Sequence, residues 1–142
     1  MFLPETPFIV KLEEIYEEKN EIILVMELME GDNLYKTIKS VAKLSEQQIY
    51  KIFSQILKGL LFLHLNGIMH RDIKPDNLMY SNRDNNSQLK ILDFSLANEY
   101  LPGQHFKDAC GTPGFMAPEI LNEKIHAEEV DVFSLGVVLY ML

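Results

Sequence analysis

A short polar stretch carries three side chains that could act together in one reaction. Within residues 70–77 (HRDIKPDN), Asp72, Lys74 and Asn77 supply a carboxylate, an amine and a carboxamide. Transfer of a phosphoryl group to a hydroxyl can use all three, because the hydroxyl needs an acceptor for its proton and the phosphate oxygens need positive charge and metal ions. The spacing therefore indicates phosphoryl transfer as the chemistry of this loop.

A second carboxylate follows the loop along the chain. Asp93 comes directly after the apolar residues 89–92, and a carboxylate in such a place is suited to holding Mg²⁺. The triplet Ala117-Pro118-Glu119 lies further on. Residues 95–118 show no periodicity, and a segment of this length without regular structure is usually functional.

The elements that must position these side chains can be read from the hydrophobic pattern. A helix is predicted from Ser45, which has capping-box spacing to Gln48, as far as the stop signal Asn66-Gly67. Its apolar stripe consists of Ile49, Ile52, Phe53, Ile56, Leu57, Leu60 and Leu63. Residues 78–80 and 89–92 are predicted strands around a polar turn at 81–87.

The remaining segments complete an α+β pattern. Residues 8–12 and 21–27 are predicted as antiparallel strands joined by a charged turn at 17–20. A short helix is expected over residues 34–41. The apolar residues 132–142 are predicted as a buried helix, because this run is too short to span a bilayer.

Composition restricts the classes of protein to which this chain could belong. The chain has 142 residues, 47% of them hydrophobic, and a net charge of -8. Such a balance favours a globular domain and argues against partners that are nucleic acid or a membrane surface. Cys110 is the single cysteine, and the amino terminus lacks a signal-peptide pattern, so an intracellular, cytoplasmic setting is expected.

The order of these motifs resembles the eukaryotic-type protein kinase superfamily, whose signature contains an HRD loop, a DFG segment and APE. Residues 70–77, Asp93-Phe94-Ser95 and residues 117–119 carry the resemblance, which covers essentially the whole chain. It implies a partial protein-kinase-like α+β fold. Residues 1–30 would be small-lobe strands and hinge, and residues 31–142 a large lobe truncated inside its central helix.

The resemblance also implies roles for the polar residues, with ATP and Mg²⁺ as cofactors. Asp72 would be the catalytic base, Lys74 would lie near the γ-phosphate, and Asn77 and Asp93 would bind magnesium. Lys74 after Asp72, together with Gly111-Thr112-Pro113, resembles the serine/threonine branch. Thr112 would then hydrogen-bond toward Asp72 and Lys74.

A nucleotide pocket is implied in the same way. Met26 would be the gatekeeper, backbone groups of Glu27 and Met29 would face the adenine, and Met79 would form part of its floor. Ordinary core packing is the alternative for these residues. For Met26 and Met79 both can hold, since a flexible thioether fills a core gap and can also line a pocket.

Two further resemblances concern regulation and architecture. Residues 111–119 (GTPGFMAPE) are similar to calcium/calmodulin-dependent kinases, so calmodulin or regulatory segments outside this chain are expected partners besides a protein substrate with Ser or Thr. Asp131 resembles the buried anchor of the large central helix, where its carboxylate would bind the catalytic-loop backbone.

Some positions depart from the family pattern. Ser95 stands in place of the expected glycine, and its side chain restricts the backbone conformations available there. Asn33 stands where kinases that prefer basic peptides often have a glutamate. Asp108 occupies a position that is often a phosphorylated threonine, so its carboxylate could pair with Arg71 as a fixed charge. The alternative for Asp108 is a solvated turn residue.

Two functions remain open from the sequence. The first is phosphoryl transfer from ATP to Ser or Thr hydroxyls of proteins, carried out by a complete kinase domain. The second is a non-catalytic pseudokinase or truncated binding module. No glycine-rich loop or strand lysine precedes Phe8, so we expect these residues to have little activity on their own.

Overall fold

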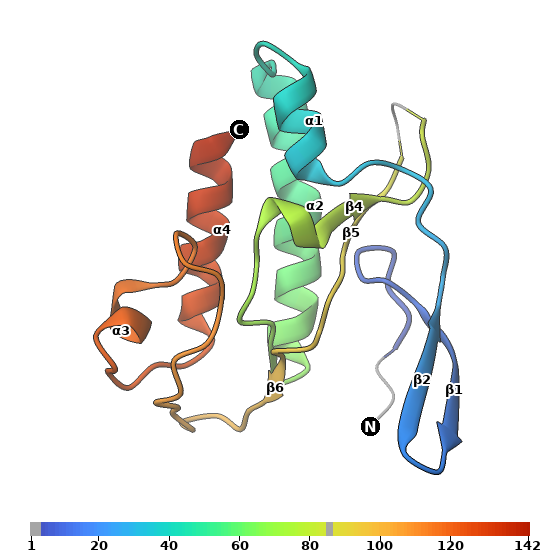
Figure 1. The fold of residues 1–142 in the computed structure, drawn as a ribbon. Helices are drawn as coiled ribbons and strands as arrows, with labels where there is room; N and C mark the ends of the chain where they lie inside the picture. Colours follow the sequence, from blue (N-terminus) through green and yellow to red (C-terminus); the bar gives the residue numbers. More distant parts are fainter. Residues whose placement is uncertain (1–3, 85–86) are drawn as a thin grey trace.

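The computed structural model describes residues 4–84 and 87–142. A hairpin of β1 (Leu12–Glu18) and β2 (Glu21–Met26) stands to one side, and helices with short strand pairs form the rest (Figure 1). This arrangement confirms the α+β class. Residues 1–3 of the expected small-lobe part and residues 85–86 of the expected turn lie outside the described residues.

The hairpin is shifted relative to the prediction. β1 begins at Leu12 rather than at residue 8, and it pairs antiparallel with β2 so that Glu18 faces Glu21 across a short Lys19-Asn20 turn. Both strands are exposed along their whole length. The sequence gives little sign of where β1 lies, because a strand without a buried face lacks apolar alternation.

The apolar run that was predicted as the first strand is buried elsewhere. Ile9 forms a parallel bridge with Ile91, and the Val10 N–H donates to the Ile91 carbonyl at 3.0 Å. Ile9 and Val10 are both buried, which accounts for their apolar character. The amino-terminal segment is thereby tied to the strand that leads to Asp93.

Helix α2 (Glu46–Leu65) is the scaffold of the larger part, as predicted. Its capping box is confirmed, because the Ser45 hydroxyl accepts from the Gln48 N–H and the Gln48 side chain accepts from the Ser45 N–H. The buried members of the predicted stripe are Ile52, Ile56, Leu60 and Leu63. Leu57 is the exception, with half of its side chain exposed.

The other elements surround α2. The predicted short helix is α1 (Leu34–Ser40), capped by Asn33, whose side chain accepts from the Lys36 N–H at 2.9 Å. Strands β4 (Leu78–Tyr80) and β5 (Leu89–Ile91) pair antiparallel around the polar turn, as predicted. Strand β4 begins directly after Asn77, and β5 ends two residues before Asp93.

One short strand lies within the long irregular segment and pairs with another, and one short helix begins at the end of the segment. β3 (Ile68–Met69) pairs with β6 (Asn98–Glu99), and α3 (Pro118–Leu121) follows the segment. Strands of two residues are too short to carry a periodic signal, so the sequence did not predict them.

The last helix, α4 (Glu129–Met141), packs beside α2 (Figure 1). Residues Leu135 and Val138 of α4 join the buried core formed around α2 and β5. Within residues 4–84 and 87–142, no helix is both long and apolar enough to cross a membrane.

Candidate active site

The backbone of the candidate catalytic loop is held from α4. Asp131 is fully buried, and its carboxylate accepts hydrogen bonds from the N–H groups of His70 at 2.8 Å and Arg71 at 2.7 Å. The His64 ring lies 2.9 Å from the same carboxylate. A buried carboxylate needs such donors. The structure confirms the predicted anchoring and shows Arg71 in the left-handed region, with φ of 67°.

His70 links the loop to the end of β5. Its Nε2 lies 2.9 Å from the Leu92 carbonyl, and its Nδ1 lies 3.2 Å from the Asp72 N–H. Because a carbonyl can only accept and an N–H can only donate, the proton is on Nε2 and the ring is neutral. Burial lowers the pKa of His70, which agrees with this neutral state.

Asp72 lies at the centre of a cluster of donors. Lys74 Nζ and Asn77 Nδ2 donate to its Oδ2 at 2.7 and 3.0 Å, and the Thr112 hydroxyl donates to its Oδ1 at 2.6 Å. Lys74 Nζ also donates to the Thr112 hydroxyl at 2.7 Å. The structure therefore brings together four predicted site residues, from the loop 70–77 and from the distant irregular segment.

The groups around Asp72 determine its protonation state. Burial alone would raise its pKa, but hydrogen bonds from Lys74 and Thr112, the Lys74 charge and the Asn77 amide outweigh that effect. The pKa of Asp72 consequently lies below its ordinary value of 3.8. Asp72 is thus a carboxylate at neutral pH and is able to accept a proton.

Two oxygen-bearing side chains were predicted to bind magnesium: Asn77 within this cluster and Asp93 after β5. Asn77 uses its Nδ2 on the Asp72 carbonyl and carboxylate, which leaves its Oδ1 as an acceptor. Asp93 adopts a left-handed φ of 62° just after β5. Hydrogen bonding by the Ser95 side chain and backbone lowers the pKa of Asp93, although the nearby Asp72 charge acts in the opposite direction.

These oxygens fit a magnesium ion. Mg²⁺ prefers carboxylate and carbonyl oxygens, and it commonly uses only one or two protein carboxylates, its other ligands being water and phosphate. In the part of the chain that the structure describes, no three His, Cys, Asp or Glu side chains gather as a metal cage. Asn77 and Asp93 would supply part of a ligand set, and their magnesium role stays a prediction.

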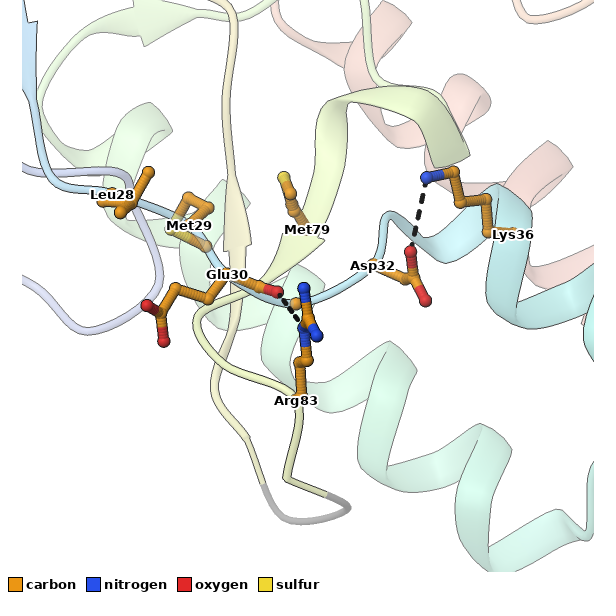
Figure 2. Close-up of a pocket in the computed structure, with 8 residues that line it drawn as sticks. Leu28, Met29, Glu30, Asp32, Lys36, Met79 and Arg83 are labelled. Carbon is orange, nitrogen blue, oxygen red and sulfur yellow. Dashed lines mark hydrogen bonds and ion pairs between the residues drawn. The ribbon is translucent and has the colours of Figure 1, made fainter.

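The linker after β2 borders an open cavity of about 850 Å³ (Figure 2). Met29 from the linker and Met79 from β4 both line it. Among the described residues, neither backbone polar group of Met29 has a hydrogen-bond partner. The lining residues are Leu28, Met29, Glu30, Gly31, Asp32, Lys36, Met79 and Arg83.

Met26 lies in a different place from Met29 and Met79. It lines a second, more apolar cavity of about 940 Å³, together with Phe94 and Asp93. Half of the Met26 side chain is exposed. The three predicted methionines are therefore distributed between two open cavities, and their pocket roles stay predictions.

Glu27 lines neither cavity. Its carboxylate accepts from Lys90 Nζ at 2.5 Å and from the Lys11 N–H at 2.7 Å. Sequence reasoning missed Lys90 and Lys11 because the three residues come from separate segments. Burial would raise the pKa of Glu27, but the hydrogen bonds and charges of Lys90 and Lys11 lower it. The side chain of Glu27 thus fixes the start of the linker.

The irregular segment contacts the candidate catalytic loop at Arg71. Arg71 Nη1 pairs with the Asp108 carboxylate, as the sequence suggested, and Arg71 Nε donates to the Leu96 carbonyl at 2.7 Å. The contact with Leu96 was not predicted, because no sequence pattern marks a backbone acceptor. Asp108 is therefore not a turn residue surrounded only by solvent.

Comparison with known proteins agrees with this geometry. The family model described as "Protein kinase domain" matches residues 3–142. The chain belongs to the protein kinase domain family.

Its relatives identify the branch that it is similar to. It is 43% identical to calcium/calmodulin-dependent protein kinase type 1 of Caenorhabditis briggsae over 134 residues, which cover 94% of this chain and 37% of the relative. It is 43% identical to type IV of Homo sapiens over 136 residues, covering 96% of this chain and 29% of the relative. For calcium-dependent protein kinase 14 of Arabidopsis thaliana the identity is 38% over 140 residues, covering 99% of this chain and 26% of the relative. The chain thus spans well under half the length of these relatives.

Proposed function

We propose that the protein containing this chain transfers the γ-phosphoryl group of ATP to Ser or Thr hydroxyls of protein substrates. The observation that carries the proposal is the Asp72 carboxylate, which is ionised and held by Lys74, Asn77 and Thr112. An ionised carboxylate offers about four lone-pair sites, and three are used here. One remains for the hydroxyl of a substrate.

Each residue of the cluster has a separate task in this mechanism. Asp72 orients the incoming hydroxyl and accepts its proton, while Lys74 places positive charge where the phosphate oxygens gain negative charge. Thr112 connects the two and fixes their spacing. Asn77 and Asp93 would hold Mg²⁺, which when bound neutralises phosphate charge. The unpaired backbone groups of Met29 and the Met79 side chain would receive the adenine.

The specificity for Ser and Thr and the mode of regulation are proposed from the contacts of Lys74 and Thr112 and from the relatives. Serine/threonine specificity is proposed because Lys74 and Thr112 contact Asp72 as the serine/threonine pattern implies. The relatives named as calcium/calmodulin-dependent kinases support control by calmodulin or by segments outside residues 1–142. We also propose an intracellular, cytoplasmic location, where ATP and such regulators are available.

The test is phosphoryl transfer from radiolabelled ATP to a generic Ser/Thr peptide, with magnesium, by the full-length protein and its Asp72→Asn variant. Loss of a general base is expected to lower kcat by roughly 10²–10⁴-fold. ATP binding, measured separately, should be unchanged. Asp84→Asn is the matched control, because it removes one carboxylate from the exposed turn after β4.

The result also separates the two functions that the sequence left open. Transfer that is lost in Asp72→Asn and kept in Asp84→Asn supports the kinase. A folded protein that transfers nothing, or an Asp72→Asn variant with full activity, contradicts the proposal. The first of these outcomes would favour the non-catalytic binding module.

A further inference from the structure

Ser95 carries a hydroxyl two positions after Asp93, the carboxylate that is predicted to bind magnesium. The Ser95 N–H donates to Asp93 Oδ1 at 3.2 Å, and the Ser95 side chain hydrogen-bonds the same carboxylate. Because an ionised carboxylate can only accept, the Ser95 hydroxyl is the donor. A glycine at position 95 would supply the N–H alone. Ser95 therefore gives Asp93 a second donor that the family pattern lacks.

The backbone on both sides of Asp93 is held from the candidate catalytic loop. Before Asp93, the Leu92 carbonyl lies 2.9 Å from His70 Nε2. After it, the Leu96 carbonyl accepts from Arg71 Nε at 2.7 Å. These contacts fix the path of the main chain, but they do not determine how the Asp93 side chain is rotated.

Ser95 lies in a closed turn between these two anchors. The Ala97 N–H donates to the Phe94 carbonyl at 3.0 Å, with Ser95 and the next residue at the centre of the turn. The Phe94 ring meets the His70 ring edge-on, with 5.0 Å between the ring centroids. The turn is thus attached at its start as well, and Ser95 is kept within hydrogen-bonding reach of Asp93.

Asp93 needs donors because a like charge lies nearby. The Asp72 carboxylate disfavours the ionised form of Asp93, so repulsion favours rotation of the Asp93 side chain away from Asp72. Within residues 4–84 and 87–142, the recorded hydrogen bonds to the Asp93 carboxylate both come from Ser95. A carboxylate has about four lone-pair sites, so about two remain for a metal ion and its water.

We propose that Ser95 is a positioning residue whose hydroxyl keeps the Asp93 carboxylate in one orientation, ready for magnesium, before the ion binds. This inference rests on the proposed function and adds a residue on which the affinity for magnesium depends. Hydrogen-bond partners of metal-binding side chains typically change metal affinity by roughly 10–100-fold when they are removed. Asp93 and Ser95 are both exposed, so we expect the lower end of that range.

The first test measures Mn²⁺ binding to the full-length protein in the presence of a non-hydrolysable ATP analogue, by electron paramagnetic resonance. Ser95→Ala keeps the Cβ and the N–H but removes the hydroxyl, and it should weaken Mn²⁺ binding by about tenfold. Ser95→Thr restores a hydroxyl and should recover most of the affinity. Ser40→Ala is the matched control and should bind as wild type, because the Ser40 hydroxyl donates to the Thr37 carbonyl at the end of α1.

The magnesium dependence of phosphoryl transfer should show the same order of variants. In Ser95→Ala the Mg²⁺ concentration that gives half of the maximal rate should rise by about tenfold. The kcat at saturating Mg²⁺ should stay close to that of the wild type, since Ser95 acts only through Asp93. A general loss of structure would instead lower kcat at every Mg²⁺ concentration, and that result would overturn the inference.

Ser95→Gly separates the hydroxyl from the backbone restriction that any side chain imposes. We expect it to weaken Mn²⁺ binding at least as much as Ser95→Ala does. If Ser95→Ala binds Mn²⁺ as wild type and only Ser95→Gly binds it more weakly, the restricted backbone is responsible and the role of the hydroxyl is refuted.

Hydrogen exchange gives a readout that needs neither metal nor activity. In metal-free Ser95→Ala the amide of residue 95 should exchange faster, after correction for the intrinsic rates, because its acceptor on Asp93 is no longer held. Unchanged exchange together with unchanged Mn²⁺ affinity would overturn the inference. If the wild type binds Mn²⁺ but transfers no phosphoryl group, the proposed function fails while the Mn²⁺ comparison still decides the role of Ser95. A wild type that binds no Mn²⁺ would refute that role.

Discussion

Asp72 accepts hydrogen bonds from three side chains, one of which, Thr112, lies 40 positions away in the sequence. The same bonds that orient the carboxylate also lower its pKa and make it a weaker base. In the proposed reaction its contribution would therefore be mainly orientation of the substrate hydroxyl, with proton acceptance late, when the phosphoryl group has begun to transfer.

Thr112→Val removes one of these donors and keeps the side-chain shape. The pKa of Asp72 should rise toward 3.8, because a hydrogen bond that favours the charged form is lost. A carboxylate with a lowered folded-state pKa stabilises the fold above its unfolded pKa and loses that effect as the pH falls through the folded value. The variant should thus be less stable by about 1–2 kcal/mol at pH 7, and the difference should shrink in acid.

Urea unfolding at neutral and acidic pH, with NMR titration of the Asp72 carboxyl, measures both effects. Thr37→Val is the control, because the Thr37 hydroxyl donates to the backbone carbonyl of Asn33, the residue that caps α1, and to no titrating group. An unchanged Asp72 titration in Thr112→Val would show that the Thr112 bond does not set this pKa.

At the scale of single residues, the sequence predicted the members of the site better than their partners. Asp72, Lys74 and Asn77 could be chosen from motif spacing, and Thr112 from the family resemblance. The contacts of Glu27 with Lys90 and of Arg71 with the Leu96 carbonyl could not be predicted. Such contacts depend on how separate segments pack, and a local pattern carries no information about that packing.

Helix α2 shows what an element contributes to the site. One face of it is buried against β5 and α4, and its end leads through β3 into the catalytic loop. The loop's position consequently depends on the packing of that face. The neighbouring residues Leu60 and Leu61 differ sharply, with exposed fractions of 2% and 56%.

This contrast gives a paired prediction. Leu60→Ala should destabilise the protein by about 2–5 kcal/mol, since it leaves a cavity in the core. Leu61→Ala removes the same atoms from an exposed position and should cost much less. Thermal and urea unfolding of the two variants check this, and equal losses would mean that the side of α2 assigned to the core is wrong.

Element boundaries were predictable where local chemistry sets them. The capping box at Ser45 and the stop at Asn66-Gly67 define α2, because the Ser45 side chain and the N–H groups of Asn66 and Gly67 satisfy free backbone groups at the helix ends. The predicted start of β1 was wrong for the opposite reason. Its acidic, exposed residues give no burial signal, while the buried Ile9 and Val10 gave a misleading one.

The molecule as a whole presents large apolar side chains on two separate elements. On the β1–β2 hairpin Ile22 is 71% exposed, and on α4 Tyr140 is 93% exposed. Single exposed apolar residues are ordinary, but a hairpin with both faces exposed is not. These surfaces suit contact with further protein.

Residues 1–142 produced on their own should therefore self-associate and bind an apolar dye. Ile22→Lys should reduce both effects, because it replaces part of the apolar surface with a charge. Gln47→Lys is the charge-matched control on the exposed start of α2. Sedimentation over a range of concentrations measures association, and a monomeric wild type that binds no dye would contradict the prediction.

The anchoring of the catalytic loop by Asp131 also has a consequence for biosynthesis. Arg71 and Asp131 are 60 residues apart. At roughly 5–20 residues per second, a ribosome adds Asp131 about 3–12 s after Arg71. For that time the nascent loop lacks the acceptor for two of its N–H groups and cannot take its final form. Chaperones that bind nascent chains have this interval in which to act on the unfinished domain.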